Sequence, residues 1–152
     1  MANKWLFITG TDTDVGKTLV ATGLLAASAK AGLRSAAIKP IAAGCEDTGA
    51  GLQNDDALQL QAASSHPLPY QQVNPVALEA AIAPHIAAEE QGKTLSASRL
   101  VGYCRGLAML PVDLLRRLVA IEQSPRVGDH LGLGIHDPTV DELGTETKLA
   151  VE

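Results

Sequence analysis

Near the start of the chain, an unbroken apolar run is followed by apolar residues at helical spacing, a pattern typical of parallel α/β proteins. Residues 5–9 form a short apolar run that ends before a glycine, as in a buried parallel strand. Apolar residues then recur at helical spacing over residues 17–31, and Gly32 supplies a stop signal. A second strand is predicted at residues 35–38. Strand, helix and strand in this order make a βαβ unit, so we predict an α/β fold with a mainly parallel sheet.

Helical patterns dominate the middle of the chain. After a glycine-rich segment that we predict to be a loop, residues 55–63 form a helix candidate with Asn54 or Asp55 as its capping residue. Residues 76–90 are rich in alanine and predicted to be helical in part, and the proline within them is expected to kink or end the helix. Residues 96–110 are predicted to form an amphipathic helix that ends at a proline.

The composition changes this picture by excluding several classes of partner. The chain has 152 residues, of which 46% are hydrophobic and 19% charged, as in ordinary globular domains. Its net charge of −5 and its lack of a basic run argue against nucleic-acid binding, which needs clustered cations. No apolar run reaches the roughly 20 residues that span a bilayer. The apolar start is too short for a signal peptide, and Cys45 and Cys104 lack metal-type spacing, so we expect a cytoplasmic protein with free thiols.

A candidate phosphate-binding loop lies between the first strand and the first helix, where residues 10–18 are GTDTDVGKT. Small residues let successive backbone N–H groups surround a phosphate, and the positive end of the next helix points at it. We expect Lys17 to contact the β- and γ-phosphates and the Thr18 hydroxyl to ligate Mg²⁺. The usual pattern has a glycine where this chain has Thr11, and here the glycine is Gly10. A glycine-capped turn with no ligand is the alternative.

This loop is the first of five motifs that follow one another in a family-specific order. The others are AIKPIAAG at residues 37–44, NDDALQL at residues 54–60, VNP at residues 73–75 and APH at residues 83–85. Over about residues 4–110, the chain resembles the dethiobiotin synthetases. The resemblance implies a P-loop NTPase-like three-layer fold and a cytoplasmic, homodimeric ligase of biotin biosynthesis. Such enzymes use ATP and Mg²⁺ to close a cyclic urea from 7,8-diaminononanoate and CO2, which gives dethiobiotin.

The resemblance also implies roles for individual residues. Lys17 and Lys39 are the implied catalytic residues, since Lys17 would hold the ATP phosphates and Lys39 the carbamate and γ-phosphate oxygens. The implied cofactor-binding residues are Thr13, Asp14, Val15, Gly16, Lys17, Thr18, Leu19 and Asp56. The implied metal ligands are Thr18 and Asp56. The implied substrate contacts are Thr13, Lys39 and Ala43, and the family commonly has serine at the last of these.

For two of these residues, the sequence supports a functional role independently of the family resemblance. Pro40 biases Lys39 toward an extended backbone at a strand end, beside the crevice where α/β sheets bind ligands. The alternative for Lys39 is a solvated lysine. The Asp56 carboxylate is a hard oxygen ligand of the kind Mg²⁺ prefers. The alternative for Asp56 is a carboxylate that only stabilises a helix N-terminus.

The resemblance stops near residue 115. There the family continues through a buried strand into a Val-Glu-Gly-Ala-Gly-Gly segment that completes its metal site, whereas this chain has Arg116 and Arg117, which are costly in a buried strand. We therefore predict a partial P-loop nucleotide-binding domain at residues 1–115 and a divergent tail of frameshifted, fused or unrelated origin at residues 116–152. We expect the sheet to be incomplete on its C-terminal side and the chain to be an inactive ligase, because the C-terminal half of the site is missing.

Two other interpretations remain open. The chain could be a non-catalytic nucleotide-binding module like MinD and ParA proteins, although these carry a second lysine early in the loop, where this chain has Asp12 and Asp14. It could also be a remnant without a stable fold. Melting with and without Mg-ATP would separate the last interpretation from the others, because a ligand that binds only the folded state raises the melting temperature.

Overall fold

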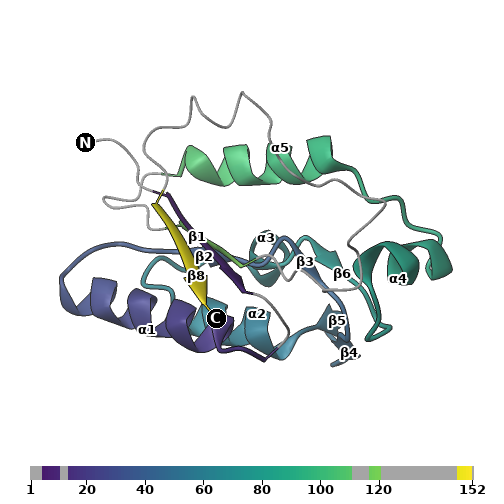
Figure 1. The fold of residues 1–152 in the computed structure, drawn as a ribbon, viewed down its shortest axis with the longest axis horizontal. Coiled ribbons are helices and arrows are strands. Elements are labelled where there is room, and N and C mark those ends of the chain that lie inside the picture. The colour runs from purple at the N-terminus through teal and green to yellow at the C-terminus, as the bar shows by residue number, and fades with distance from the viewer. Residues whose placement is uncertain (1–4, 11–13, 111–116, 121–146, 152) are drawn as a thin grey trace.

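A parallel β-sheet forms the centre of the computed structural model, which describes residues 5–10, 14–110, 117–120 and 147–151. Four strands form this sheet in the order β2-β7-β1-β8 (Figure 1). They are β1 (Trp5–Gly10), β2 (Ala37–Ile38), β7 (Arg117–Ala120) and β8 (Thr147–Val151). Each adjacent pair runs parallel, so the predicted parallel sheet is confirmed.

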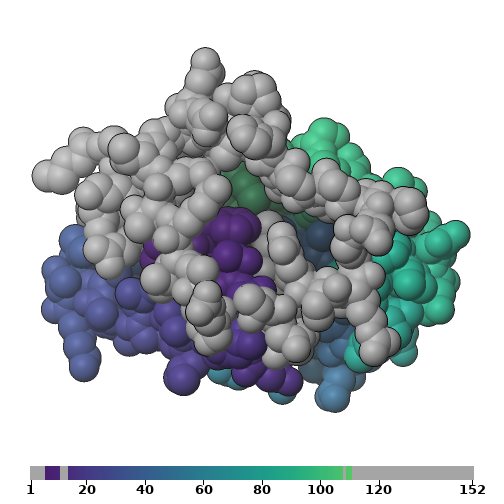
Figure 2. Space-filling model, in the orientation of Figure 1, coloured from purple at the N-terminus to yellow at the C-terminus, as the bar shows by residue number. Residues whose placement is uncertain are grey.

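Helices cover both faces of this sheet. Figure 1 shows α1 and α2 below it and α5 above it, which makes three layers. The helices are α1 (Lys17–Lys30), α2 (Asp55–Ala63), α3 (Tyr70–Val73), α4 (Pro84–Glu90) and α5 (Ala97–Ala108). The space-filling view shows α1 along the lower left of the same face and the teal and green surfaces of α4 and α5 on its right (Figure 2). None of the described helices is long and apolar enough to cross a membrane.

Alternate residues of β1 belong to different hydrophobic clusters because successive side chains of a strand point to opposite faces. Leu6 and Ile8 lie in a cluster with residues of α1 and α2, including Leu25 and Leu60. Phe7 packs against a second cluster, to which α5 contributes Leu107. A strand that is buried on both faces is expected to be apolar throughout, which explains the unbroken apolar run that predicted β1.

The three main helical predictions are confirmed as α1, α2 and α5, with small differences at their ends. The Asn54 side chain accepts a hydrogen bond from the backbone N–H of Ala57, so Asn54 is the cap of α2. The expectation for the proline at residue 84 is wrong: Pro84 begins α4 instead of ending a helix. A proline is tolerated in the first turn because its missing N–H would have no partner within the helix.

The glycine-rich segment after β2 contains short strands that the sequence pattern did not predict. β3 (Ile41–Ala42) pairs in parallel with β6 (Val76–Ala77), and β4 (Glu46–Asp47) forms a hairpin with β5 (Leu52–Gln53). Two-residue strands are too short for an alternating pattern to be recognised. β3, β4 and β5 lie between the carboxyl end of β2 and the start of α2, whereas β6 follows α3.

The C-terminal part of the chain contributes two strands to the central sheet. β7 lies between β1 and β2 and pairs with both of them, and β8 pairs with the other edge of β1. Arg117, expected to be costly in a strand, is the first residue of β7 and lies opposite Trp5. Residues 111–116, 121–146 and 152 lie outside the described residues. The predicted division of the chain at residue 115 therefore stays a prediction.

Candidate functional site

The loop between β1 and α1 turns through two residues with left-handed backbone conformations. Asp14 has φ 61°, and Gly16, which precedes the first residue of α1, has φ 94°. Glycine adopts positive φ without steric cost, and aspartate is one of the few other residues that visits this region. The chain thus enters α1 directly from a tight turn, which is the arrangement that presents helix N–H groups to an anion. Thr13 lies outside the described residues.

Gly10 ends β1 at a point where no side chain fits. A Cβ atom at Gly10 would lie 2.6 Å from Cγ2 of Val15 and 3.1 Å from Cδ of Lys17. The glycine therefore allows the returning loop and the stem of Lys17 to close over the end of the strand. This contact gives a packing reason for the offset glycine of the motif.

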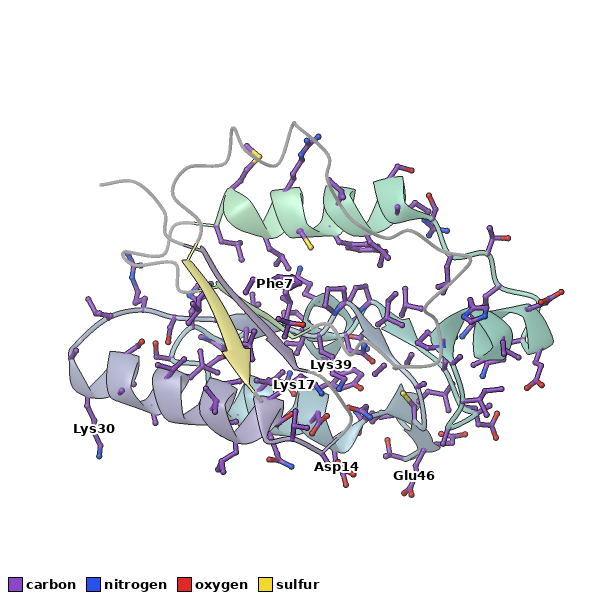
Figure 3. The ribbon with its side chains drawn as sticks, viewed as in Figure 1. Phe7, Asp14, Lys17, Lys30, Lys39 and Glu46 are labelled. Carbon is purple, nitrogen blue, oxygen red and sulfur yellow. The ribbon has the colours of Figure 1, made fainter. Side chains whose placement is uncertain are left out.

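Lys17 is the first residue of α1 and is only 8% exposed. Its positive charge contributes to lowering the pKa of Asp56, so the ammonium lies within electrostatic range of that carboxylate. Figure 3 shows Lys17 and Lys39 close together in projection, toward the carboxyl end of β1. The structure therefore places two lysines and an aspartate around the end of the loop.

Lys39 and Asp56 form an ion pair across the site. The Nζ atom of Lys39 donates a hydrogen bond of 2.7 Å to Oδ2 of Asp56. Lys39 follows β2 and is 3% exposed, whereas Asp56 lies in the first turn of α2. A buried ammonium is costly unless it is paired, so the carboxylate offsets the desolvation of Lys39. The predicted alternative of a solvated lysine is wrong.

The electrostatics of the site keep Asp56 ionised. Burial alone would raise the pKa of its carboxyl group. The hydrogen bond and charge of Lys39, a hydrogen bond from Thr18 and the charge of Lys17 outweigh burial and hold that pKa below its ordinary value. The carboxylate is therefore negative at neutral pH and surrounded by donors.

The hydroxyl of Thr18 and the carboxylate of Asp56 form a donor set that fits Mg²⁺. Thr18 is among the groups that lower the pKa of Asp56, so its hydroxyl lies near the carboxylate, and both oxygens are hard ligands. Within the described ranges, no group of three or more His, Cys, Asp or Glu residues could hold a metal ion. Mg²⁺ usually binds through one or two carboxylates together with water and substrate phosphates, so a small protein donor set is sufficient.

The remaining predicted residues have different surroundings. Val15 and Gly16 are half-buried in the loop, whereas Asp14 is exposed. The side chain of Leu19 is 76% exposed, so it does not contribute to the core although it lies at helical spacing with core residues. The carbonyl of Ala43 accepts a hydrogen bond of 3.4 Å from Nδ2 of Asn54. The predicted binding roles of these residues stay predictions.

Asn74 is a buried residue of the site that was not selected from the sequence. It is 3% exposed, and its Nδ2 atom donates a hydrogen bond of 2.7 Å to the carbonyl of Lys39. The backbone N–H of Lys39 donates to the carbonyl of Val73 at 2.8 Å. The motif at residues 73–75 was the available signal, but nothing in a linear motif indicates which backbone it will hold.

Comparison with known proteins identifies the family. A family model described as AAA domain matches residues 4–119. The chain belongs to this family. The match includes β1, α1 and most of β7, and it ends at residue 119, a few residues beyond residue 115, near which we expected the resemblance to stop. The prediction of a P-loop α/β fold is confirmed.

Curated relatives of this AAA-domain chain carry the name ATP-dependent dethiobiotin synthetase BioD. The chain is 56% identical to that of Marinobacter nauticus over 115 residues, which are 76% of this chain and 49% of the relative. It is 65% identical to that of Cellvibrio japonicus over 105 residues, which are 69% of this chain and 46% of the relative. It is 55% identical to that of Pseudomonas aeruginosa over 108 residues, which are 71% of this chain and 47% of the relative. The chain spans about half the length of the curated relatives it matches, and its resemblance to dethiobiotin synthetases over that segment is confirmed.

Proposed function

We propose that this chain carries the ATP-binding part of a dethiobiotin synthase-type ligase, which uses ATP and Mg²⁺ to form dethiobiotin from 7,8-diaminononanoate and CO2. One observation supports this proposal above all: Lys17, Thr18, Lys39 and Asp56 converge at the end of the P-loop. The convergence lies in a chain whose curated relatives are named as ATP-dependent dethiobiotin synthetases. A cytoplasmic location and a homodimeric state belong to the same proposal.

In the proposed reaction, one amine of the substrate attacks CO2 and loses a proton to give a carbamate. A carbamate oxygen then takes the γ-phosphoryl group and ADP leaves, after which the second amine closes the ring and releases phosphate. Phosphoryl transfer is accelerated mainly by positioning and charge neutralisation. Lys17 would bind the ATP phosphates, and the buried ammonium of Lys39 would stabilise negative oxygens between carbamate and γ-phosphate. Mg²⁺, held by Thr18 and Asp56, would neutralise phosphate charge.

Lys39 would have to exchange partners in this scheme. Its ammonium is bonded to Asp56 in the structure, and the same carboxylate is the candidate ligand for Mg²⁺. If the carboxylate held the cation, the Lys39 ammonium would be available to substrate oxygens at the same place. The short ion pair therefore supports a site in which both groups are already positioned before the ligands arrive.

The proposal is tested by ATP binding and by product formation in the same preparation. Lys17→Ala should weaken Mg-ATP binding by at least about tenfold in calorimetry, because charge-assisted contacts to phosphate are lost. Lys30→Ala is the matched control, since Lys30 is an exposed lysine in the last turn of the same helix. Unchanged affinity in Lys17→Ala would refute the site.

Activity is measured with diamine, bicarbonate and Mg-ATP, by diamine-dependent phosphate release and detection of the cyclic urea. Product formation that is lost in Lys39→Ala would support the full proposal. ATP binding without product would favour the interpretation that part of the site is lacking, or that the chain is a non-catalytic module. Failure of wild-type protein to bind ATP would contradict all of these.

A further inference from the structure

A chain of side-chain hydrogen bonds joins the two segments that carry Lys39 and Asp56. The hydroxyl of Tyr70 accepts a hydrogen bond of 2.7 Å from the backbone N–H of Asn54 and contacts Oδ1 of Asn74 at 3.2 Å as a donor. Asn74 in turn donates from Nδ2 to the carbonyl of Lys39 at 2.7 Å. One phenol on the short helix α3 therefore connects the end of β2 to the start of α2.

The side chain of Asn54 fixes the position of Asp56. Its Oδ1 atom accepts from the N–H of Ala57 at 3.3 Å, and its Nδ2 atom donates to the carbonyl of Ala43 at 3.4 Å. Asp56 lies two residues after this cap, in the turn that the cap stabilises. A shift of Asn54 would therefore move the Asp56 carboxylate with it.

Both N–H groups and the oxygen of the Asn74 side-chain amide have partners, which favours one orientation of the amide. Nδ2 donates to the carbonyls of Lys39 and Val76, the latter at 3.2 Å, and Oδ1 accepts from Tyr70. Asn74 is buried, so turning the amide over would leave polar atoms without partners at considerable cost. Burial, the largest influence, raises the pKa of Tyr70, and the hydroxyl therefore keeps the proton that it donates.

We propose that Tyr70 is a positioning residue whose hydroxyl, through Asn54 and Asn74, holds the Lys39 ammonium against the Asp56 carboxylate. The positioning of Lys39 and Asp56 by Tyr70 does not depend on which reaction the protein catalyses. Its consequence for metal and nucleotide binding rests on the proposed function.

The test compares Tyr70→Phe with Tyr103→Phe, which removes the same hydroxyl from an exposed tyrosine on α5. Without ligands, the rate of reductive methylation of Lys39 is measured by mass spectrometry, with the buried Lys17 as an internal reference. Tyr70→Phe should make Lys39 about fivefold more reactive, the factor expected from losing one ordinary hydrogen bond. The reactivity of Lys17 should stay the same in both variants.

A second measurement uses Mn²⁺ with ATP, and the bound metal is quantified by electron paramagnetic resonance. Tyr70→Phe should weaken Mn²⁺ affinity about tenfold, as expected when groups that orient a metal ligand are removed. Affinity for ATP without metal should remain within about twofold of wild type in both variants. Tyr103→Phe should match wild type in every measurement.

Each alternative result has a definite meaning. Equal Lys39 reactivity in the two variants would overturn the inference, and so would a joint rise of Lys39 and Lys17, which indicates general loosening. Unchanged Mn²⁺ affinity in Tyr70→Phe would refute the consequence for the metal. If wild-type protein binds no ATP, the proposed function fails, while Lys39 reactivity still decides whether Tyr70 positions the ion pair.

Discussion

Replacing Gly10 by alanine would test how closely the P-loop packs on the end of β1. The new methyl group would lie 2.6 Å from Cγ2 of Val15, well inside the contact distance of two carbon atoms. Val15 is β-branched and has few alternative rotamers, so it cannot turn away without cost. The methyl group would also lie 3.1 Å from Cγ and Cδ of Lys17, so relief of the clash must move the loop, the lysine stem or both.

The expected cost is that of overpacking, about 1–3 kcal/mol in the free energy of unfolding. Urea denaturation measures this change as a lower midpoint at an unchanged slope. Mg-ATP affinity should fall in the same variant, because the stem of Lys17 is displaced from the position that the glycine allows. Calorimetric titration with Mg-ATP measures that second effect.

Gly23→Ala is the matched control, because Gly23 lies inside α1 and a Cβ atom there meets nothing within 4 Å. It should stabilise the protein by up to about 1 kcal/mol through helix propensity. Val15→Ala removes the closest clashing atom, so the double variant Gly10→Ala/Val15→Ala should lose less stability than the two single changes added together. The packing argument is wrong if Gly10→Ala leaves both the midpoint and the Mg-ATP affinity unchanged.

Two further predictions concern pH and the core. Because the pKa of Asp56 is lowered in the folded state, its ion pair contributes stability above the ordinary aspartate pKa of about 3.9, and this contribution disappears as pH falls through the folded value. Urea midpoints between about pH 2 and 5 should therefore vary more steeply in wild type than in Asp56→Asn, and parallel curves would contradict this. Leu60→Ala should cost about 2–5 kcal/mol, because Leu60 is fully buried, whereas Leu19→Ala at an exposed position should stay within about 0.5 kcal/mol. Equal urea midpoints for these two variants would refute the assignment of the core.

The amino-acid sequence by itself determined the elements whose signals are local. The apolar run of β1, the periodicity of α1, the cap of α2 at Asn54 or Asp55 and the amphipathic pattern of α5 all lie within a few residues of the structure that they specify. The P-loop is local in the same sense, because turn, lysine and helix start follow one another directly. Hydrophobic period and capping chemistry act over one or two turns, so they can be recognised without knowledge of the fold.

Only the tertiary structure decided which of these elements meet. β7 lies between β1 and β2, although it follows them by many residues, because parallel strands are paired through crossover connections. The partner of Lys39 is an aspartate 17 residues further along the chain, and the phenol that aligns the two lies on a different helix again. These choices depend on burial and on satisfying buried polar groups, which are properties of residues distant in sequence. For that reason the sequence could identify Lys39 and Asp56 only as separate candidates, and only the folded structure shows that they form an ion pair.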